Sequence, residues 1–294
     1  MLTKRIMGHF ISPILFLMLI FSCSKPETII HVSIQGECAE LFYTNPELDI
    51  CYVKFMEKVS MDKDIELKFA LSENKFMLIQ VPVLENKYIL PIESGGSYRL
   101  DIDENNQIHV SGPNKDGIEL YQSVMQYEAG KLDWKQFRGN LSSETMMKVE
   151  GFKQKELSGF KKLLAEKKIT DSFYQLIEKD RDCFYAFVQS YLLSQDMLRI
   201  YRNDPDQEGK DSLLTNLSHV FIEYPTNDKK LMVSPSWHSY ALFMNIKLYR
   251  QYSKRNFNKN NIERLLSPEN GSFWFEEMKE SFSGSMLESI LAIY

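Results

Sequence analysis

The spacing of apolar residues changes once along this chain of 294 residues, close to position 112. Before it, apolar and polar residues alternate, as in Ile30, Val32 and Ile34, and a period of two with one polar face is typical of half-buried antiparallel strands. Beyond it, apolar residues recur about every 3.6 residues, as on a helix face. The sequence therefore predicts an α+β protein with a β-domain over residues 28–112 and a helical domain over residues 113–294.

Within the first region, short runs of alternating or apolar residues predict roughly six or seven strands. Asn105-Asn106 lies between two of them, and asparagine tolerates the positive φ of a tight hairpin turn. Strands of this length and number favour a small antiparallel β-sandwich or an open barrel. The candidate strands lie at residues 30–34, 51–56, 65–71, 76–81, 88–92 and 98–102, with a last one after the asparagines.

The second region predicts a bundle of about six helices. Its longest helical pattern covers residues 171–202 and carries aromatic and aliphatic residues from Phe173 to Leu192. Ser234-Pro235 predicts a helix start, with an N-cap serine and proline at the first helical position, and Ser267-Pro268 repeats that signal. Residues 285–294 form a further apolar helical pattern.

The first 22 residues predict an export signal. Lys4 and Arg5 precede an unbroken apolar run over residues 14–21, which is too short for a permanent membrane span of roughly 20 residues. The stretch 19–23 resembles a lipobox, which implies cleavage before Cys23 and diacylation of its thiol. Residues 23–27 would then be a lipidated tether. The alternative is an ordinary secreted protein in which Cys23 is incidental.

A lipid anchor implies that the membrane is the first partner of the mature chain. Acyl chains hold a protein stably because each buried methylene contributes about 0.8 kcal/mol. The tether holds one glutamate, Glu27, rather than the acidic run that sends some lipoproteins to the cell surface. We therefore expect a bacterial envelope protein anchored in the outer membrane, on the periplasmic side.

Net charge argues against nucleic acid as a partner. The chain has 35 basic and 40 acidic residues. Loss of residues 1–22 removes Lys4 and Arg5, which leaves 33 basic against 40 acidic residues and a net charge of −7. A nucleic-acid-binding protein would show a basic footprint instead.

The remaining cysteines do not form a redox motif. There is no Cys-x-x-Cys, the spacing that lowers a thiol pKa and supports disulfide exchange. Cys38 and Cys51 are either a structural disulfide between neighbouring strands or two separate buried thiols, and both arrangements are open. Cys183 lies in the aromatic helical pattern, where we expect a small core residue.

No motif predicts a metal, a cofactor or a catalytic residue. The four histidines of the mature chain lack a second ligand at metal-binding spacing, and we expect them at the surface or in hydrogen bonds. The stretch Asp101 to Asn105 lacks the later glycine and glutamate of a calcium loop, and Ile118 replaces the lysine of a phosphate loop after Gly117. The histidines are His31, His109, His219 and His238.

Two aromatic features are open to a binding role. Trp237 and Trp274, if exposed, could supply a platform for a glycan or a peptide. Glu276, Glu277 and Glu280 cluster after Phe273-Trp274-Phe275, and we interpret them as the solvated face of a helix whose aromatic side is buried.

The order of segments resembles that of a known family. A lipobox, a small β-domain and a helical stretch containing Trp237-His238-Ser239-Tyr240-Ala241 look like the front half of the TlpA/ResA-like thiol–disulfide oxidoreductases, which are lipid-anchored in bacterial envelopes. In that family a thioredoxin domain with Cys-x-x-Cys follows, and this chain lacks it. The resemblance therefore transfers no catalytic residue. It implies that the chain is the front part of a longer ancestral protein, and the alternative is a complete protein that ends in a docked helix.

Three functional hypotheses follow. The first is a non-catalytic envelope lipoprotein that acts as a scaffold or binds an envelope protein partner. The second is a shortened disulfide reductase whose catalytic domain is missing or is supplied by another chain. The third is a lipoprotein that binds a glycan or peptide nutrient on an aromatic platform.

Overall fold

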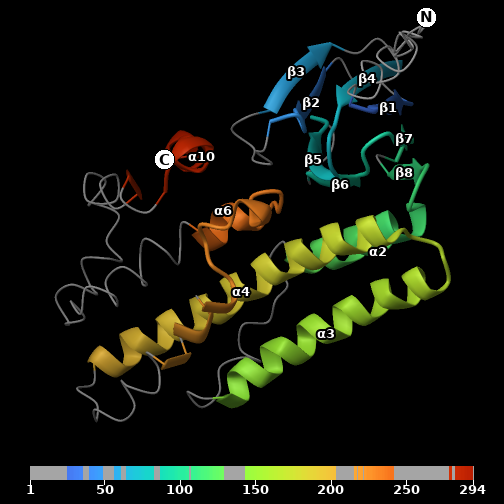
Figure 1. The fold of residues 1–294 in the computed structure, drawn as a ribbon. Helices are drawn as coiled ribbons and strands as arrows, with labels where there is room; N and C mark the ends of the chain where they lie inside the picture. Colours follow the sequence, from blue (N-terminus) through green and yellow to red (C-terminus); the bar gives the residue numbers. More distant parts are fainter. Residues whose placement is uncertain are drawn as a thin grey trace, which may run out of the picture.

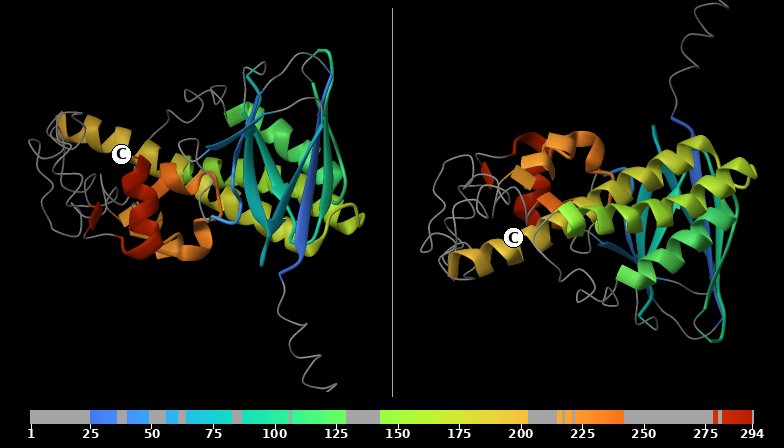
Figure 2. Two further views of the ribbon diagram at one scale, coloured as in Figure 1. Left: turned by 90° about the horizontal axis from the view of Figure 1, so that it is seen from above. Right: turned by 90° about the horizontal axis from the view of Figure 1, so that it is seen from below.

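A computed structural model places the strands together at one end of the molecule and the long helices beside and below them (Figure 1). The C-terminal helix (residues 284–293) lies beside the short helix at residues 237–240, to one side of the sheets (Figures 1 and 2). The structure describes residues 25–35, 40–48, 56–60, 64–82, 87–105, 107–128, 143–202, 215–216, 218–220, 222–241, 278–279 and 282–293.

The described strands form two separate four-stranded sheets and no closed barrel, which confirms the α+β class. The first sheet has the order β4-β1-β7-β8 and the second the order β3-β2-β5-β6. Strands of the first sheet are β1 (Glu27–Ile34), β4 (Asp64–Ala70), β7 (Ser97–Ile102) and β8 (Ile108–Ser111). Strands of the second are β2 (Glu40–Thr44), β3 (Met56–Ser60), β5 (Lys75–Gln80) and β6 (Tyr88–Ile92).

One pair of strands corrects the expectation of purely antiparallel pairing. β1 and β7 run parallel, with Ile30 opposite Tyr98, while the other paired strands are antiparallel. After β6 the chain leaves the second sheet and enters the first sheet beside the start of β1. There the amide of Ile29 donates to the carbonyl of Gly96 at 2.9 Å. The long connection through other strands permits this parallel pair, which a hairpin could not form.

Alternation along the strands agrees with the predicted pattern in most places. Along β1 every second residue is buried, and the hairpin between β7 and β8 lies at the predicted asparagine turn. β5 is buried on both faces, so its apolar run is continuous rather than alternating. The sequence reading missed β2, and most of the candidate strand at 51–56 lies outside the described residues.

The helical part contains α2 (Lys115–Glu128), α3 (Ser143–Ala165), α4 (Asp171–Arg202), the short 3₁₀ helix η3 (Lys229–Leu231), α6 (Trp237–Tyr240) and α10 (Gly284–Ile293). The predicted helix over residues 171–202 is confirmed, as is a helix within 285–294. α6 begins later than predicted, at Trp237, while the Ser234 hydroxyl accepts the amide of Ser236 in the preceding turn. Ser267-Pro268 lies outside the described residues.

The junction between the two regions depends on glycine. Gly112 has φ +124°, and a Cβ there would lie 2.5 Å from the carbonyl oxygen of Ser97. No other residue tolerates that backbone and that contact without a shift of the strand. Asn114 follows with φ 57°, and α2 begins at Lys115. Residues 112–114 therefore connect β8 to α2, and the predicted break at residues 112–117 is shorter than expected because residues 115–117 are already helical.

One hydrophobic core runs across this junction. Both sheets contribute to it, and so do Ile118 and Tyr121 of α2 and Phe173 and Ile177 of α4. The Tyr121 ring lies 5.5 Å from that of Phe76 on β5. A second cluster joins Cys183 of α4 to the η3–α6 segment and α10. None of the described helices is both long and apolar enough to cross a membrane.

Candidate functional site

A cleft of about 490 Å³ lies where the second sheet, the start of α4, η3 and the start of α10 meet. Segments far apart in the sequence build its walls. The β4–β5 turn, the start of α4 as far as Lys179, η3 and the residues just after it, and the start of α10 all contribute to the lining. The lining residues are Glu73, Asn74, Lys75, Ser172, Gln175, Leu176, Lys179, Lys229, Lys230, Met232, Val233 and Ser285.

Lysines dominate the charge of this cleft. Among the described lining residues, four are lysines and Glu73 is the single acid. Lys75 is almost buried, with a side chain 9% exposed, and its ammonium group lies 2.6 Å from the carboxylate of Glu73. Lys229 and Lys230 are exposed to solvent, and Lys179 is half-buried. The lining thus carries four positive charges and one negative charge.

Hydrogen bonds fix the sheet side of the cleft. Asn74 accepts the amide of Ser94 at 3.1 Å, and the Ser94 hydroxyl donates to the Leu71 carbonyl at 2.6 Å. These bonds hold the β4–β5 turn against the end of β6. Glu73 lies in this anchored turn, and Lys75 is the first residue of β5 after it.

Glu93, just after β6, fixes the start of α4. Its carboxylate accepts hydrogen bonds from the hydroxyls of Thr170 and Ser172, the latter at 2.5 Å, and from the side-chain amide of Asn114 at 2.7 Å. The Thr170 hydroxyl accepts the amide of Phe173 at 3.1 Å and so caps the first turn of α4. One carboxylate therefore ties the second sheet, the start of α2 and the start of α4 together.

Asp180 fixes the wall that carries two of the lysines. It lies fully buried on α4, next to Lys179 in the chain, and accepts the hydroxyls of Tyr121 at 2.8 Å and Ser234 at 2.5 Å. The η3 helix begins nearby, where Asp228 accepts the amide of Lys230 at 2.9 Å. These bonds hold the η3–α6 segment against α4, so Lys229 and Lys230 stay beside the cleft.

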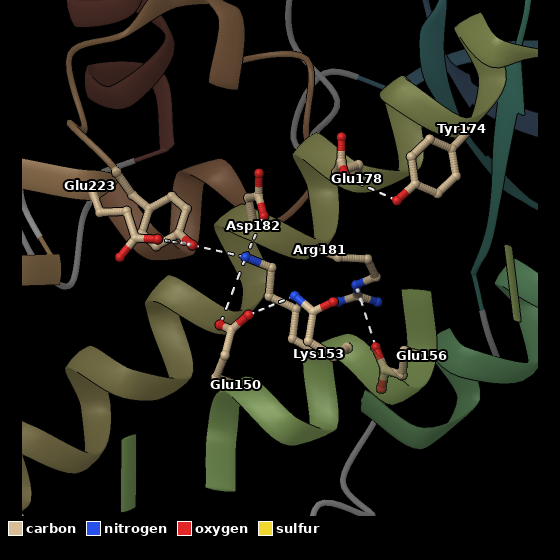
Figure 3. Close-up of polar contacts among 10 residues, drawn as sticks. Glu150, Lys153, Glu156, Tyr174, Glu178, Arg181, Asp182 and Glu223 are labelled. Carbon is tan, nitrogen blue, oxygen red and sulfur yellow. Dashed lines mark hydrogen bonds and ion pairs between the residues drawn. The ribbon is translucent and has the colours of Figure 1, made fainter. Parts of the chain in front are cut away.

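Next to the part of α4 that lines the cleft, α3 and α4 share buried charges (Figure 3). Lys153 of α3 lies 2.6 Å from Asp182 of α4 and donates to the hydroxyl of Tyr224 at 2.8 Å. Burial alone would lower the pKa of Lys153, but its hydrogen bonds to Asp182 and Tyr224 raise it above the usual value. Arg181 is fully buried, 3.7 Å from Glu156.

Aromatic rings complete the surroundings of Arg181. Its guanidinium lies 4.5 Å from the ring centre of Phe184 and 5.8 Å from that of Tyr185. Burial raises the pKa of the Glu156 carboxyl, and the positive charge of Arg181 opposes that shift. Such groups must be paired when they leave water, and here they lock α3 to α4.

Several predicted site residues lie outside the described part of the chain. These are Cys23, the pair Cys38 and Cys51, and the aromatic and acidic stretch that contains Trp274 and Glu276. The lipidation site and the disulfide therefore stay predictions. Among the described residues, no group of three histidine, cysteine or acidic side chains could hold a metal ion.

Trp237 contradicts the aromatic platform proposed for it. It is fully buried, its indole donates to the carbonyl of Thr226 at 3.0 Å, and its ring packs on Phe282. This large apolar side chain is part of the second hydrophobic cluster. Trp237 therefore cannot present a face to a glycan or peptide.

The histidines and Cys183 divide between surface and core. His31 and His109 lie at the surface beside Glu66 and Asp103, as expected. His238 is instead fully buried against the ring of Trp237, and burial lowers its pKa to about 4. Cys183 is a buried core residue, as predicted, and burial raises the pKa of its thiol.

Sequence reasoning missed the lysine-lined cleft. Lys75, Lys179 and Lys229 are far apart in the chain and belong to a strand, a helix and a 3₁₀ turn. The adjacent Lys229-Lys230 pair was the one local signal. A charged pair is usually a solvated surface feature, so that signal could not identify a site by itself.

Comparison with known proteins does not indicate a function for the chain. No protein-family model matches the chain, and no curated protein matches it. The resemblance to the TlpA/ResA-like oxidoreductases stays a prediction that depends on the order of segments in the sequence.

Proposed function

We propose that this protein is a non-catalytic, lipid-anchored lipoprotein of the bacterial envelope. Its lysine-lined cleft binds an anionic group of a partner. The anchor is the part of this proposal that depends on Cys23. The cleft is the part that depends on the fold. The two sheets, arranged as a sandwich, and the helices, arranged as a bundle, would serve as the frame that brings the cleft walls together.

The charge of the cleft lining is the observation that carries the proposal. The described lining residues include four lysines and one glutamate, whereas the chain as a whole carries a net charge of −5. A concave site with one sign of charge concentrates its field and attracts ligands of the opposite sign. The cationic cleft would therefore attract anions, while the acidic remainder of the protein would repel them.

The support around the cleft favours binding over a passive surface role. Asn74, Glu93 and Asp180 hold three of its walls through hydrogen bonds between elements far apart in the sequence. A site whose walls are fixed before the ligand arrives loses less conformational entropy on binding. This arrangement would present Lys75 and Lys179 in set positions.

Calorimetric titration of the purified full-length chain in non-ionic detergent tests the proposal. The probes are inorganic phosphate, a short oligoglutamate peptide and an oligogalacturonate. We expect at least one probe to bind, and the double variant Lys229→Gln/Lys230→Gln to weaken binding about tenfold, since each exposed ion pair contributes up to about fivefold.

The matched control is Lys155→Gln, which removes a lysine from the exposed face of α3 outside the cleft. It should leave the affinity unchanged. If none of the three probes binds, or if Lys155→Gln weakens binding as much as the cleft variant, the proposed binding function is wrong.

A further inference from the structure

Lys75 already holds a carboxylate within the cleft. Its ammonium group is nearly removed from water and lies 2.6 Å from an oxygen of Glu73, two residues earlier in the chain. The Glu73 side chain, in contrast, is 67% exposed. A buried ammonium needs an anionic partner, but an exposed carboxylate can return to water at little cost. The pair is therefore asymmetric, because its cation is buried and its carboxylate is exposed.

We propose that Glu73 is an internal substitute for a carboxylate of the ligand, and that the ligand is an acidic peptide segment of a partner protein. This inference deepens the proposed function and depends on it. On binding, a ligand carboxylate replaces Glu73 on Lys75, and Glu73 moves into solvent. Charge on Lys75 stays balanced throughout, and no covalent bond changes.

The remaining lysines indicate that the ligand has more than one negative charge. Within the described part of the chain, Lys179, Lys229 and Lys230 have no carboxylate at ion-pair distance. They belong to two elements on other sides of the cleft from Lys75. Lysine acts as a point charge, whereas arginine suits planar, two-point recognition of one carboxylate or phosphate. Separate point charges suit a chain of spaced carboxylates.

Two features favour a peptide over an acidic glycan. The described lining contains no aromatic ring, and aromatic faces are the usual support for a sugar. It does contain the exposed side chains of Gln175 and Ser285, which can pair with main-chain amides and carbonyls. Spaced carboxylates on a backbone of amides are what a glutamate- or aspartate-rich segment offers.

Fluorescence anisotropy with a labelled oligoglutamate peptide tests this inference on the full-length chain in non-ionic detergent. Glu73→Gln removes the internal competitor and should tighten peptide binding about fivefold, the effect of one exposed ion pair. Lys75→Gln should weaken it by about tenfold or more. The matched control is Glu104→Gln, which removes an exposed carboxylate from the β7–β8 turn and should change the affinity little.

Glu73→Gln is the decisive variant because its side chain is exposed, whereas Lys75→Gln removes a buried group and could disturb the fold. If Glu73→Gln binds the peptide no more tightly than Glu104→Gln does, the inference is wrong. The proposed function still stands in that case, provided that Lys229→Gln/Lys230→Gln weakens binding. Tighter binding of an oligogalacturonate of equal charge would overturn the assignment to a peptide. Failure of every anionic probe would instead reject the proposed function itself.

Discussion

The ammonium group of Lys153 on α3 lies 2.6 Å from the carboxylate of Asp182 on α4, and only 8% of the lysine side chain is exposed. The same ammonium donates to the hydroxyl of Tyr224 at 2.8 Å. The main-chain carbonyl of Tyr224 accepts a hydrogen bond from the hydroxyl of Tyr240, which belongs to α6. Lys153 thus connects the helical hairpin to the segment that carries the wall of the cleft.

Replacing Lys153 should destabilise the protein. Lys153→Met leaves Asp182 and the Tyr224 hydroxyl without their cation, and removing one partner of a buried ion pair costs about 3 kcal/mol. Asp182 retains some access to water, so we expect a loss of about 2 kcal/mol in the free energy of unfolding. Urea unfolding followed by circular dichroism measures it. Lys155→Met, at an exposed position on the same helix, is the control, and an equal loss in both variants would contradict the prediction.

The sequence patterns that depend on near neighbours predicted the structure well. The helix over residues 171–202 has the predicted bounds because its apolar residues repeat at helical spacing along one continuous element. β6 likewise has the predicted bounds, and Gly112 marks the true junction. In each case the local chain alone determines the pattern.

What depends on distant residues was not predictable. The parallel pairing of β1 and β7 is set by the path of the chain between them. Lys153 and Asp182 are brought together only by the packing of α3 on α4, and the sequence left the exposure of Trp237 open, whereas the structure buries it. The cleft is the extreme case, since its walls come from a turn, a helix, η3 and α10.

Burial of His238 should make stability depend on pH. Its pKa is lowered to about 4 in the folded protein, because burial disfavours the charged ring, against 6.5 for an ordinary histidine. His238 therefore binds a proton more readily in the unfolded chain than in the folded protein. Its contribution to the free energy of unfolding is lost as the pH falls from 6.5 towards 4. The full effect is about 3 kcal/mol.

The comparison of wild type with His238→Gln isolates this effect from other titrating groups. The free energy of unfolding, measured by urea titration across that pH range, should fall more steeply in the wild type. His109→Gln is the control, because the His109 side chain is 64% exposed. Parallel pH profiles for the wild type and His238→Gln would show that His238 is not the source.

The lipid anchor is tested at Cys23. If the predicted lipobox is used, cleavage and acylation would both require that thiol, so Cys23→Ala should abolish incorporation of labelled palmitate and release the protein or block its processing. Cys183→Ala is the matched control, since that residue lies in the core and should not affect labelling. Palmitate labelling that survives in the Cys23→Ala variant would end the lipoprotein interpretation.

Cys183 should be chemically silent in the folded protein. It is fully buried, burial raises the pKa of its thiol, and its Sγ lies 3.9 Å from the Leu231 carbonyl oxygen as a weak donor. A thiol in that state is not a nucleophile, because the thiolate is the reactive form. We expect iodoacetamide to label Cys183 only after denaturation, as read by mass spectrometry of the peptide that contains it.

The same reasoning predicts the result of a redox assay. A disulfide reductase needs an accessible thiol of low pKa, and Cys183 has neither property. The purified chain should therefore not accelerate the reduction of insulin by dithiothreitol above background. Single replacement of Cys38, Cys51 and Cys183 by serine is the control series, because each variant assigns any residual rate to one thiol. Catalysis that disappears with one of these replacements would favour the shortened reductase over a non-catalytic binding protein.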